Sequence, residues 1–214
     1  MMVKIILADD HNIIRQGIST MLNNENDMAV VATADNGRDA VKLVKKHKPD
    51  VVVMDISMPD LNGIEASKMI KDALPDTKII ALSVHTGRRF VTGMLKAGVS
   101  GYLIKQCALE ELVGAIHCVM KNQSYLSPEI TEVVMKDYVN GSLNTDASVE
   151  LSGREREVLQ LVAEGMKSDD IASRLNISIK TVSSHRSQVM KKLGIDSIAE
   201  LAIYAVREGV IVVD

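Results

Sequence analysis

The residues best suited to chemistry in this 214-residue sequence stand directly after short apolar runs. Five of them close such runs: Asp9, Asp10, Asp55, Ser83 and Lys105. The runs are rich in β-branched and aliphatic residues, as in strands that are buried on both faces of a parallel sheet. Because parallel strands share a direction, we expect these side chains on one rim, in the crevice at the carboxyl ends of the strands.

The chemistry expected of this rim is phosphoryl transfer. Three carboxylates would repel one another unless a cation neutralised them. The set offers oxygen ligands and neither His nor Cys, which favours Mg²⁺. Lys105 supplies a point charge that can hold phosphoryl oxygens, and Ser83 supplies a hydroxyl. Any one of these residues alone would more often be structural, but five in this order predict a phosphoryl group on Asp55.

The elements that must position this rim alternate between strands and helices. Apolar runs predict five strands, at residues 4–8, 28–34, 50–55, 77–83 and 101–104. Three- and four-residue apolar spacing predicts five helices, at residues 14–22, 36–47, 64–70, 88–96 and 108–120. This alternation predicts an α/β, doubly wound, five-stranded parallel sheet.

The loop after Asp55 adds a family resemblance, carried by Met58-Pro59-Asp60 and Asn62-Gly63. With the strand-end residues, these motifs make residues 1–124 similar to the receiver domain of two-component response regulators, which has a flavodoxin-like fold. The resemblance implies that Asp55 is the phosphoacceptor of a sensor histidine kinase. It implies a Mg²⁺ site made by Asp9, Asp10, Asp55 and the backbone carbonyl of Ser57, with Asp9 acting largely through water. The implied phosphoryl-binding and switch residues are Lys105, Ser83 and Tyr102.

Two positions bear on how far this resemblance reaches. A Mg²⁺-dependent hydrolase with an aspartyl-phosphate intermediate would share the nucleophile, but such enzymes usually place an acid/base Asp two residues on. This chain has Ser57 there, which cannot act as the acid/base.

Gln106 stands where many receivers have Pro preceded by a cis bond. A cis bond before Gln would cost about 3–4 kcal/mol, so the geometry of that peptide stays open.

The charge distribution divides the chain into three segments. Residues 1–124 carry a balance of +1, residues 125–150 a balance of −4 and residues 151–214 a balance of zero. With 46% hydrophobic and 25% charged residues, the chain has the composition of a globular protein, and its length suits two domains. We expect a receiver domain at 1–124, a linker with a short helix at 125–148 and a second domain at 149–214.

The sequence predicts a cytoplasmic protein without a membrane partner. No apolar run approaches the roughly 18 residues needed to span a membrane. The N-terminus enters a strand pattern directly and lacks the layout of a signal peptide. Cys107 and Cys118 offer neither a disulfide framework nor a metal-site spacing, so we expect both as reduced core residues.

The segment 149–214 predicts a small all-α domain of four helices. Ser152 and Glu155 form a capping box at its first helix. A later helix, at residues 178–193, has apolar residues on one face and polar residues on the other. Two short helices joined by a tight turn, the second polar on its outer face, suit a helix-turn-helix in the major groove. A plain solvated helix face would show the same stripe.

Specific motifs resolve that ambiguity. Leu151-Ser152-Gly153-Arg154-Glu155, Lys180-Thr181-Val182 and Lys191-Lys192-Leu193-Gly194 make residues 149–214 similar to the DNA-binding domain of the NarL/FixJ (LuxR-type) regulators. The resemblance implies binding to double-stranded DNA, with RNA polymerase as a further candidate partner. The expected DNA-contacting residues are Lys180, Thr181, Ser183, Ser184, His185, Ser187, Gln188, Lys191 and Lys192. Ser183 and Lys167-Ser168-Asp169 depart from the family pattern and reduce positive charge, so the target site cannot be copied from relatives.

The last helix, at residues 197–208, has two apolar sides. Ile198, Leu201, Ala202 and Ala205 are expected to face inward. An outer strip consists of Ala199, Ile203 and Val206. Isolated surface apolar residues would explain the strip equally well, but the family uses this helix to dimerise on DNA. The resemblance therefore implies a homodimer.

Taken together, these features predict the response regulator of a two-component system, a regulator rather than an enzyme. Mg²⁺-dependent phosphorylation of Asp55 would control sequence-specific DNA binding and transcription. The main alternative is a constitutive DNA binder whose receiver works mainly as a protein-interaction module. A degenerate receiver would have lost part of the acidic set, which is complete here. A regulator acting only through protein contacts would not need the helix-turn-helix.

Overall fold

The computed structural model describes residues 2–106, 109–139 and 151–212. The chain divides into two compact units, Met1–Thr145 and Asp146–Asp214. Cys107 and residues 140–148 of the predicted linker lie outside the described residues. Where the structure is described there is no cis peptide bond, so the peptide before Gln106 is trans. No helix in the described part of the chain is long and apolar enough to cross a membrane.

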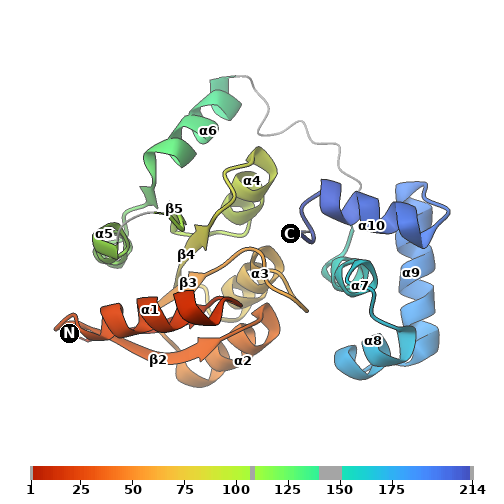
Figure 1. The fold of residues 1–214 in the computed structure, drawn as a ribbon, viewed down its shortest axis with the longest axis horizontal. Coiled ribbons are helices and arrows are strands. Elements are labelled where there is room, and N and C mark those ends of the chain that lie inside the picture. Colours follow the sequence, from red (N-terminus) through yellow and green to blue (C-terminus); the bar gives the residue numbers. More distant parts are fainter. Residues whose placement is uncertain (1, 107–108, 140–150, 213–214) are drawn as a thin grey trace. The chain divides into compact units, whose positions relative to one another are not determined.

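The first unit is a parallel sheet with helices packed on it (Figure 1). Its strands are β1 Val3–Ala8, β2 Met28–Ala34, β3 Val51–Met54, β4 Lys78–Ser83, β5 Gly101–Ile104 and β6 Tyr125–Leu126. Its helices are α1 Asn12–Asn23, α2 Gly37–His47, α3 Gly63–Ala73, α4 Arg88–Lys96, α5 Leu109–Met120 and α6 Pro128–Val139. The strand order is β2-β1-β3-β4-β5-β6, and all neighbours are parallel. The predicted doubly wound parallel sheet is confirmed.

The sheet has a sixth strand that the sequence did not predict. β6 extends the sheet beyond β5 through the pairs Gly101–Tyr125 and Tyr102–Leu126. The Ser127 N–H then donates to the Tyr102 carbonyl at 3.0 Å. A strand of two residues is too short for an alternating or a continuous apolar pattern, so periodicity could not detect it.

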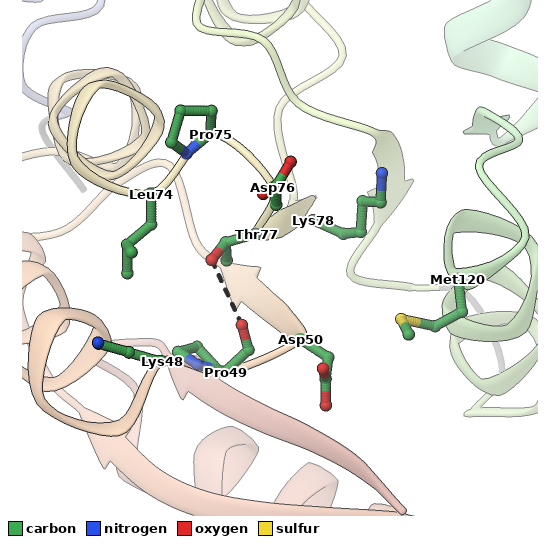
Figure 2. A pocket seen from close by; sticks show the side chains of 9 residues that line it. All are labelled: Lys48, Pro49, Asp50, Leu74, Pro75, Asp76, Thr77, Lys78 and Met120. Atoms are coloured by element: carbon green, nitrogen blue, oxygen red, sulfur yellow. Dashed lines mark hydrogen bonds between the residues drawn. The ribbon is translucent and has the colours of Figure 1, made fainter. Parts of the chain in front are cut away.

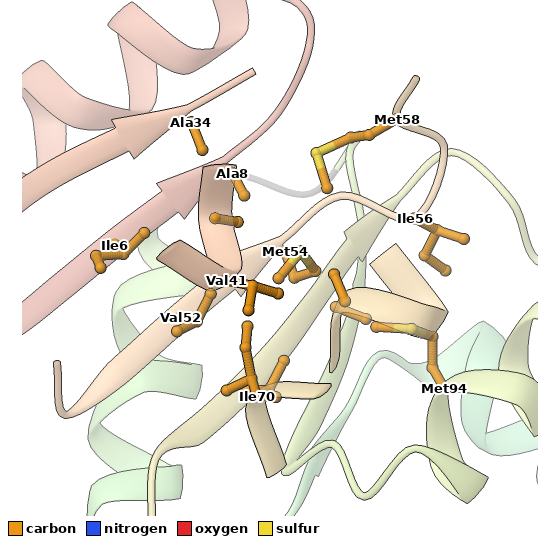
Figure 3. Close-up of a cluster of buried hydrophobic side chains, with 14 of the residues drawn as sticks. Ile6, Ala8, Ala34, Val41, Val52, Met54, Ile56, Met58, Ile70 and Met94 are labelled. Atoms are coloured by element: carbon orange, nitrogen blue, oxygen red, sulfur yellow. The ribbon is translucent and has the colours of Figure 1, made fainter. Parts of the chain in front are cut away.

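Apolar layers on both faces of the sheet fix the central strand β3. On one face, helices α2, α3 and α4 pack over a layer that includes Val52 and Met54 (Figure 3). On the other face, α1 and α5 pack over a layer that includes Val51 and Val53. All four residues of β3 are fully buried, and each such side chain contributes about 1.5–3 kcal/mol on burial. The position of the next residue, Asp55, is therefore tightly determined.

Helix α6 packs with the first unit. Ile130 is fully buried in the same layer as α4, and Val133 and Val134 pack against that layer. At the other end of the helix, Arg88 Nε donates to Asp137 Oδ2 at 2.9 Å. The sequence predicted this helix within a linker because its own pattern does not show what it packs on. The predicted segment boundaries stay predictions.

The second unit contains the four helices α7 Gly153–Ala163, α8 Ser168–Leu175, α9 Ile179–Leu193 and α10 Ile198–Arg207. Side chains from all four form one aliphatic core, which includes Val158, Ile171, Val182 and Leu201. α8 ends at Asn176, whose φ of 52° turns the chain tightly toward α9. The predicted four-helix, all-α architecture is confirmed.

Candidate functional site

The carboxyl ends of β1, β3, β4 and β5 lie next to one another because these strands are neighbours in the sheet. The Asp55 N–H donates to the Ala8 carbonyl at 2.8 Å, which joins the ends of β3 and β1. The Lys105 N–H donates to the Ser83 carbonyl at 2.9 Å, which joins the ends of β5 and β4. The predicted rim therefore exists, with Asp9, Asp55, Ser83 and Lys105 on successive strand ends.

Two buried carboxylates share one ammonium group on this rim. Lys105 Nζ lies 2.6 Å from Asp55 Oδ2 and 2.9 Å from Asp9 Oδ2. The side chains of Asp9 and Asp55 are only 1% and 3% exposed. Charges buried this deeply need compensation, and one ammonium compensates only one carboxylate. The site therefore keeps an excess of negative charge even before Asp10 is counted.

Asp10 and His11 extend this pair into an acidic cluster. Ligand atoms of Asp9, Asp10, His11 and Asp55 all lie within 4.8 Å of one another. Asp9 Oδ2 is buried, and the Lys105 ammonium, which it shares with Asp55, lies 2.9 Å away. Converging carboxylates with an excess of negative charge fit a hard divalent cation.

His11 was absent from the predicted set, which contained oxygen ligands alone. The structure places His11 Nδ1 2.7 Å from Asp10 Oδ1 and 3.3 Å from Asp9 Oδ1. The His11 N–H also donates to Asp9 Oδ1 at 2.8 Å. The signal in the sequence was adjacency, since His11 follows the two aspartates directly. Its side chain is largely exposed, so it borders the buried part of the cluster.

Burial sets the protonation of the Asp55–Lys105 pair. Burial raises the pKa of Asp55 from 3.8 to about 6, and the charge of Lys105 opposes that rise. Burial also disfavours the ammonium form of Lys105, but the Asp55 and Asp9 carboxylates together outweigh this effect and raise the pKa of Lys105. At neutral pH the pair is therefore a carboxylate and an ammonium, so Asp55 can act as a nucleophile.

Ser83 and Tyr102 meet at the loop between β4 and α4. The His85 N–H donates to Ser83 Oγ at 3.1 Å, and the Tyr102 hydroxyl donates to the His85 carbonyl at 2.6 Å. Both side chains are fully buried, and burial raises the pKa of Tyr102 above its ordinary value. The His85 ring stacks on Phe90 with 4.5 Å between centroids. The two predicted switch residues are thus joined through the backbone of His85.

The loop after β3 has a closely fixed backbone. Asp60 adopts a φ of 70°, and Arg38 Nε holds its carboxylate at 3.2 Å. A Cβ on Gly63 would lie 2.0 Å from the Asp55 carbonyl oxygen, so only glycine fits there. The Ser57 N–H donates to Asp55 Oδ1 at 3.4 Å. The predicted loop motif therefore positions backbone groups beside the carboxylate of Asp55.

A separate pocket of about 280 Å³ lies at the opposite ends of the strands (Figure 2). Its lining residues are Lys48, Pro49, Asp50, Leu74, Pro75, Asp76, Thr77, Lys78 and Met120. Thr77 Oγ1 donates to the Pro49 carbonyl at 3.3 Å, a contact that joins the starts of β3 and β4. None of the predicted site residues lines this pocket.

In the second unit, α9 presents the expected polar face. Its helix begins with the Ser178 side chain accepting the Thr181 N–H at 3.1 Å. Six predicted DNA-contacting residues are exposed: Lys180, Ser184, Ser187, Gln188, Lys191 and Lys192. Thr181, Ser183 and His185 are partly buried. The helix is thus free to offer its exposed side to a ligand, while its buried side packs on α7 and α8.

Lys192 has an internal partner. Lys192 Nζ lies 2.7 Å from Glu155 Oε2, and the Glu155 side chain is 5% exposed. Glu155 also completes the predicted capping box with Ser152 at the start of α7. The ion pair therefore fixes the end of α9 on α7. The predicted DNA contact of Lys192 stays a prediction.

The outer strip of α10 is exposed as expected, with Ile203 at 68% and Val206 at 41%, and Ala199 is also exposed. Leu201 and Ala205 are buried on the opposite side. Ile198 is 50% exposed, so its expected inward position is wrong. It is the first residue of the helix, one turn before the buried side begins at Leu201.

Family models match both units. A model for the response regulator receiver domain matches residues 5–117. A model for bacterial regulatory proteins of the luxR family matches residues 149–205. The oxygen regulatory protein NreC of Staphylococcus haemolyticus is 38% identical over 212 residues, which cover 96% of this chain and 98% of NreC.

Solved structures agree in fold. A LuxR-family two-component response regulator from an Aurantimonas species has 33% identity and a TM-score of 0.62, and the match covers 65% of this chain and 99% of that one. RcsB from Salmonella enterica serovar Typhimurium, bound to promoter rprA with phosphomimetic BeF3-, has 29% identity and a TM-score of 0.60. That match covers 95% of this chain and 98% of RcsB.

The parallel sheet, its acidic rim and the helix-turn-helix define a two-component response regulator that controls transcription, and the chain belongs to that family. Within it, the chain is a NarL/FixJ regulator, with a receiver domain followed by a LuxR-type DNA-binding domain. This family is regulatory and not typically enzymatic, and its receiver domains typically use Mg²⁺ at an acidic pocket.

Proposed function

We propose that Asp55 accepts a phosphoryl group from a sensor histidine kinase, and that this event controls how the second unit binds double-stranded DNA. The observation that carries the proposal is the buried Asp55–Lys105 pair at the end of β3, with the acidic cluster beside it. The role is regulatory rather than enzymatic. Because the proposed role links a kinase to DNA inside the cell, we propose a cytoplasmic location.

Mg²⁺ is the cation that best suits the acidic cluster. Asp9, Asp10 and Asp55 would hold it together with the backbone carbonyl of Ser57, and Asp9 would act largely through water. When bound, Mg²⁺ supplies the positive charge that lets an anionic phosphoryl group approach an anionic carboxylate. Support comes from the convergence of these carboxylates and from the single ammonium that the buried Asp9 and Asp55 share.

The residues of this chain divide the transfer between them. A carboxylate oxygen of Asp55 forms the new O–P bond while the N–P bond of the phosphohistidine breaks and its electron pair returns to the imidazole. Lys105 now pairs with Asp55 and would exchange that carboxylate for phosphoryl oxygens. The Ser83 hydroxyl, buried at the neighbouring strand end, would donate to the same group.

The output is DNA binding through α9. We place Ser183, Ser184, Ser187 and Gln188 nearest the base edges. Lys180 and Lys191 would contact phosphates, which fix the position of the helix without reading sequence. Dimerisation would use the outer strip of α10, made by Ala199, Ile203 and Val206. RNA polymerase is a further proposed partner at the promoter.

Phosphorylation is tested by labelling the full chain in Mg²⁺ with a small phosphodonor such as acetyl phosphate. We expect one acid-stable, base-labile phosphoryl group per chain, and none in Asp55→Asn. Asp60→Asn is the matched control, because Asn also tolerates the left-handed conformation of that position. Stoichiometric labelling of Asp55→Asn would refute the assignment.

A further inference from the structure

Helix α6 is fastened at its start to the strand that carries the switch tyrosine. The Ser127 N–H, one residue before α6, donates to the Tyr102 carbonyl at 3.0 Å. Ser127 Oγ donates to Glu111 Oε1 on α5 at 3.0 Å. Because of this hydrogen bond, a displacement of the Tyr102 backbone would also displace Ser127 and the first turn of α6.

The far end of α6 is fastened to α4 by one ion pair. Arg88 Nε lies 2.9 Å from Asp137 Oδ2, and the Asp137 side chain is only 11% exposed. Arg88 is the first residue of α4, and Asp137 lies in the last turn of α6. Between the two fastenings, Ile130 packs in the layer that also contains Val91 and Met94 of α4. The two helices lie beside each other (Figure 1).

The loop that precedes Arg88 is the one that joins Ser83 to Tyr102. The backbone of His85 is held from both sides, by its N–H on Ser83 Oγ and by its carbonyl on the Tyr102 hydroxyl. Arg88 follows only three residues later. Contacts and short stretches of chain therefore connect the proposed phosphoryl site, through Lys105 and the β4–α4 loop, to the C-terminal end of α6.

We propose that the Arg88–Asp137 ion pair is a clasp that holds α6 on α4 in the unphosphorylated protein, and that phosphorylation of Asp55 opens it. The inference rests on the proposed phosphorylation of Asp55 and names how that site is read out. In the structure, Lys105 pairs with the Asp55 carboxylate, and Ser83 Oγ accepts the His85 N–H. The clasp is closed while these contacts are in place.

The opening follows from competition for the Ser83 hydroxyl. If Ser83 Oγ turns toward a phosphoryl group on Asp55, the His85 N–H loses its acceptor, and the loop must move. Arg88 moves with the loop, while Asp137 stays on α6. A phosphoryl group can shift this equilibrium only if it is bound more tightly in the open state. By the same linkage, breaking the clasp must favour phosphorylation of Asp55.

The test uses charge reversal in the full chain. Arg88→Glu and Asp137→Lys each break the clasp, and the double variant restores a pair of opposite charges. Asp137→Asn is a milder substitution in case a reversal disturbs folding. Arg89→Glu is the matched control for Arg88→Glu, because Arg89 is the exposed neighbour on α4 and the substitution changes the net charge by the same amount. Amide hydrogen exchange of residues 128–139 is measured with and without acetyl phosphate and Mg²⁺, beside the labelling of Asp55.

In the wild type, phosphodonor should speed amide exchange in α6 by about fivefold or more, a typical size for coupled sites. The single clasp variants should show this faster exchange without phosphodonor and should reach a higher extent of labelling at Asp55 at a subsaturating phosphodonor concentration. The double variant and Arg89→Glu should resemble the wild type. A labelled wild type with unchanged exchange in α6, or single variants that exchange like Arg89→Glu, would overturn the clasp alone. An unlabelled wild type would contradict the proposed function, and the clasp with it.

Discussion

At the scale of single residues, Asp55 combines burial with a charge it must carry at neutral pH. Its side chain is 3% exposed, and burial raises its pKa to about 6 in spite of Lys105. Burial makes the ionised form of this carboxylate less stable than it would be in water, and an added positive charge nearby stabilises it. The same property that prepares Asp55 for a cation and a phosphoryl group should therefore lower the stability of the cation-free protein.

The cost of ionising the buried Asp55 should make the free energy of unfolding depend on pH in a predictable direction. The pKa of Asp55 is about 6 in the folded protein, and its ordinary value in an unfolded chain is 3.8, so the folded state binds this proton more tightly. The contribution of Asp55 to the free energy of unfolding should fall as the pH rises from about 4 to 6, by roughly 3 kcal/mol at most. Asp55→Asn removes this contribution.

Urea unfolding of wild type and Asp55→Asn in EDTA at pH 4.5 and pH 7.5 measures the effect. We expect the stability difference, variant minus wild type, to be more positive at pH 7.5. Comparing the two proteins cancels the titration of groups that they share. A difference that does not change with pH would show that Asp55 keeps an ordinary pKa.

The residues on the rim could be predicted because each one interrupts an apolar pattern at a strand end. His11 was missed although it directly follows Asp9 and Asp10, because adjacency alone does not distinguish a His in the acidic cluster from an exposed loop residue. Arg88 and Asp137 could not be paired either, because they lie 49 positions apart. Contacts of that range depend on how α6 returns to α4, which the periodicity of neither helix specifies.

At the scale of elements, the sequence predicted those with a long or continuous apolar pattern. β3 was clear because a four-residue run buried on both faces leaves few alternatives. β6 was missed because two residues make no pattern, and α6 was placed in a linker because its apolar side could have faced solvent or another chain. Ile198 was placed inward by its spacing, but the first residue of a helix lies at its edge.

Helix α9 yields a prediction about how DNA is bound. Lys180 and Lys191 are exposed on it, and each should neutralise one phosphate. Lys180→Ala and Lys191→Ala should weaken binding to all sequences alike and reduce the salt slope of log K by about one each. Titration at several salt concentrations, with a selected site and a random duplex, measures both effects.

Ser184→Ala provides the contrast within the same helix. It removes a hydroxyl reader without changing the charge, so it should leave the salt slope unchanged and alter the preference among sites. Hydroxyl readers discriminate less than a bidentate Arg, and we therefore expect a degenerate binding site. A lysine variant that changes sequence preference but keeps the wild-type salt slope would contradict these assignments.

At the scale of the whole molecule, the DNA-binding segment has little charge with which to hold DNA as a monomer. Residues 151–214 carry equal numbers of acidic and basic residues, so non-specific attraction should be weak. Two joined copies add their contacts, because the second contact becomes effectively intramolecular. Dimerisation through α10 is therefore the expected route to useful affinity.

Ile203→Asp tests that route, since Ile203 is the most exposed apolar residue of α10. A charge there should prevent pairing of the two copies and weaken DNA binding at least about tenfold, the loss expected when linked contacts separate. Sedimentation with DNA and phosphodonor measures the assembly. Arg207→Gln at the end of α10 lowers the net charge by the same one unit and serves as a control for charge alone. Wild-type affinity in Ile203→Asp would exclude this helix from the interface.

The central claim is that phosphorylation of Asp55 controls DNA binding, and a single titration tests it most directly. A site selected in vitro with the full chain is titrated with wild type and Asp55→Asn, each with and without acetyl phosphate in Mg²⁺. The account predicts that phosphodonor raises the affinity of the wild type by about fivefold or more, within the usual range of coupling, and leaves Asp55→Asn unchanged. If Asp55 is labelled and the wild-type affinity is the same under both conditions, phosphorylation does not control DNA binding. The protein would then bind DNA constitutively, and its receiver would have another role.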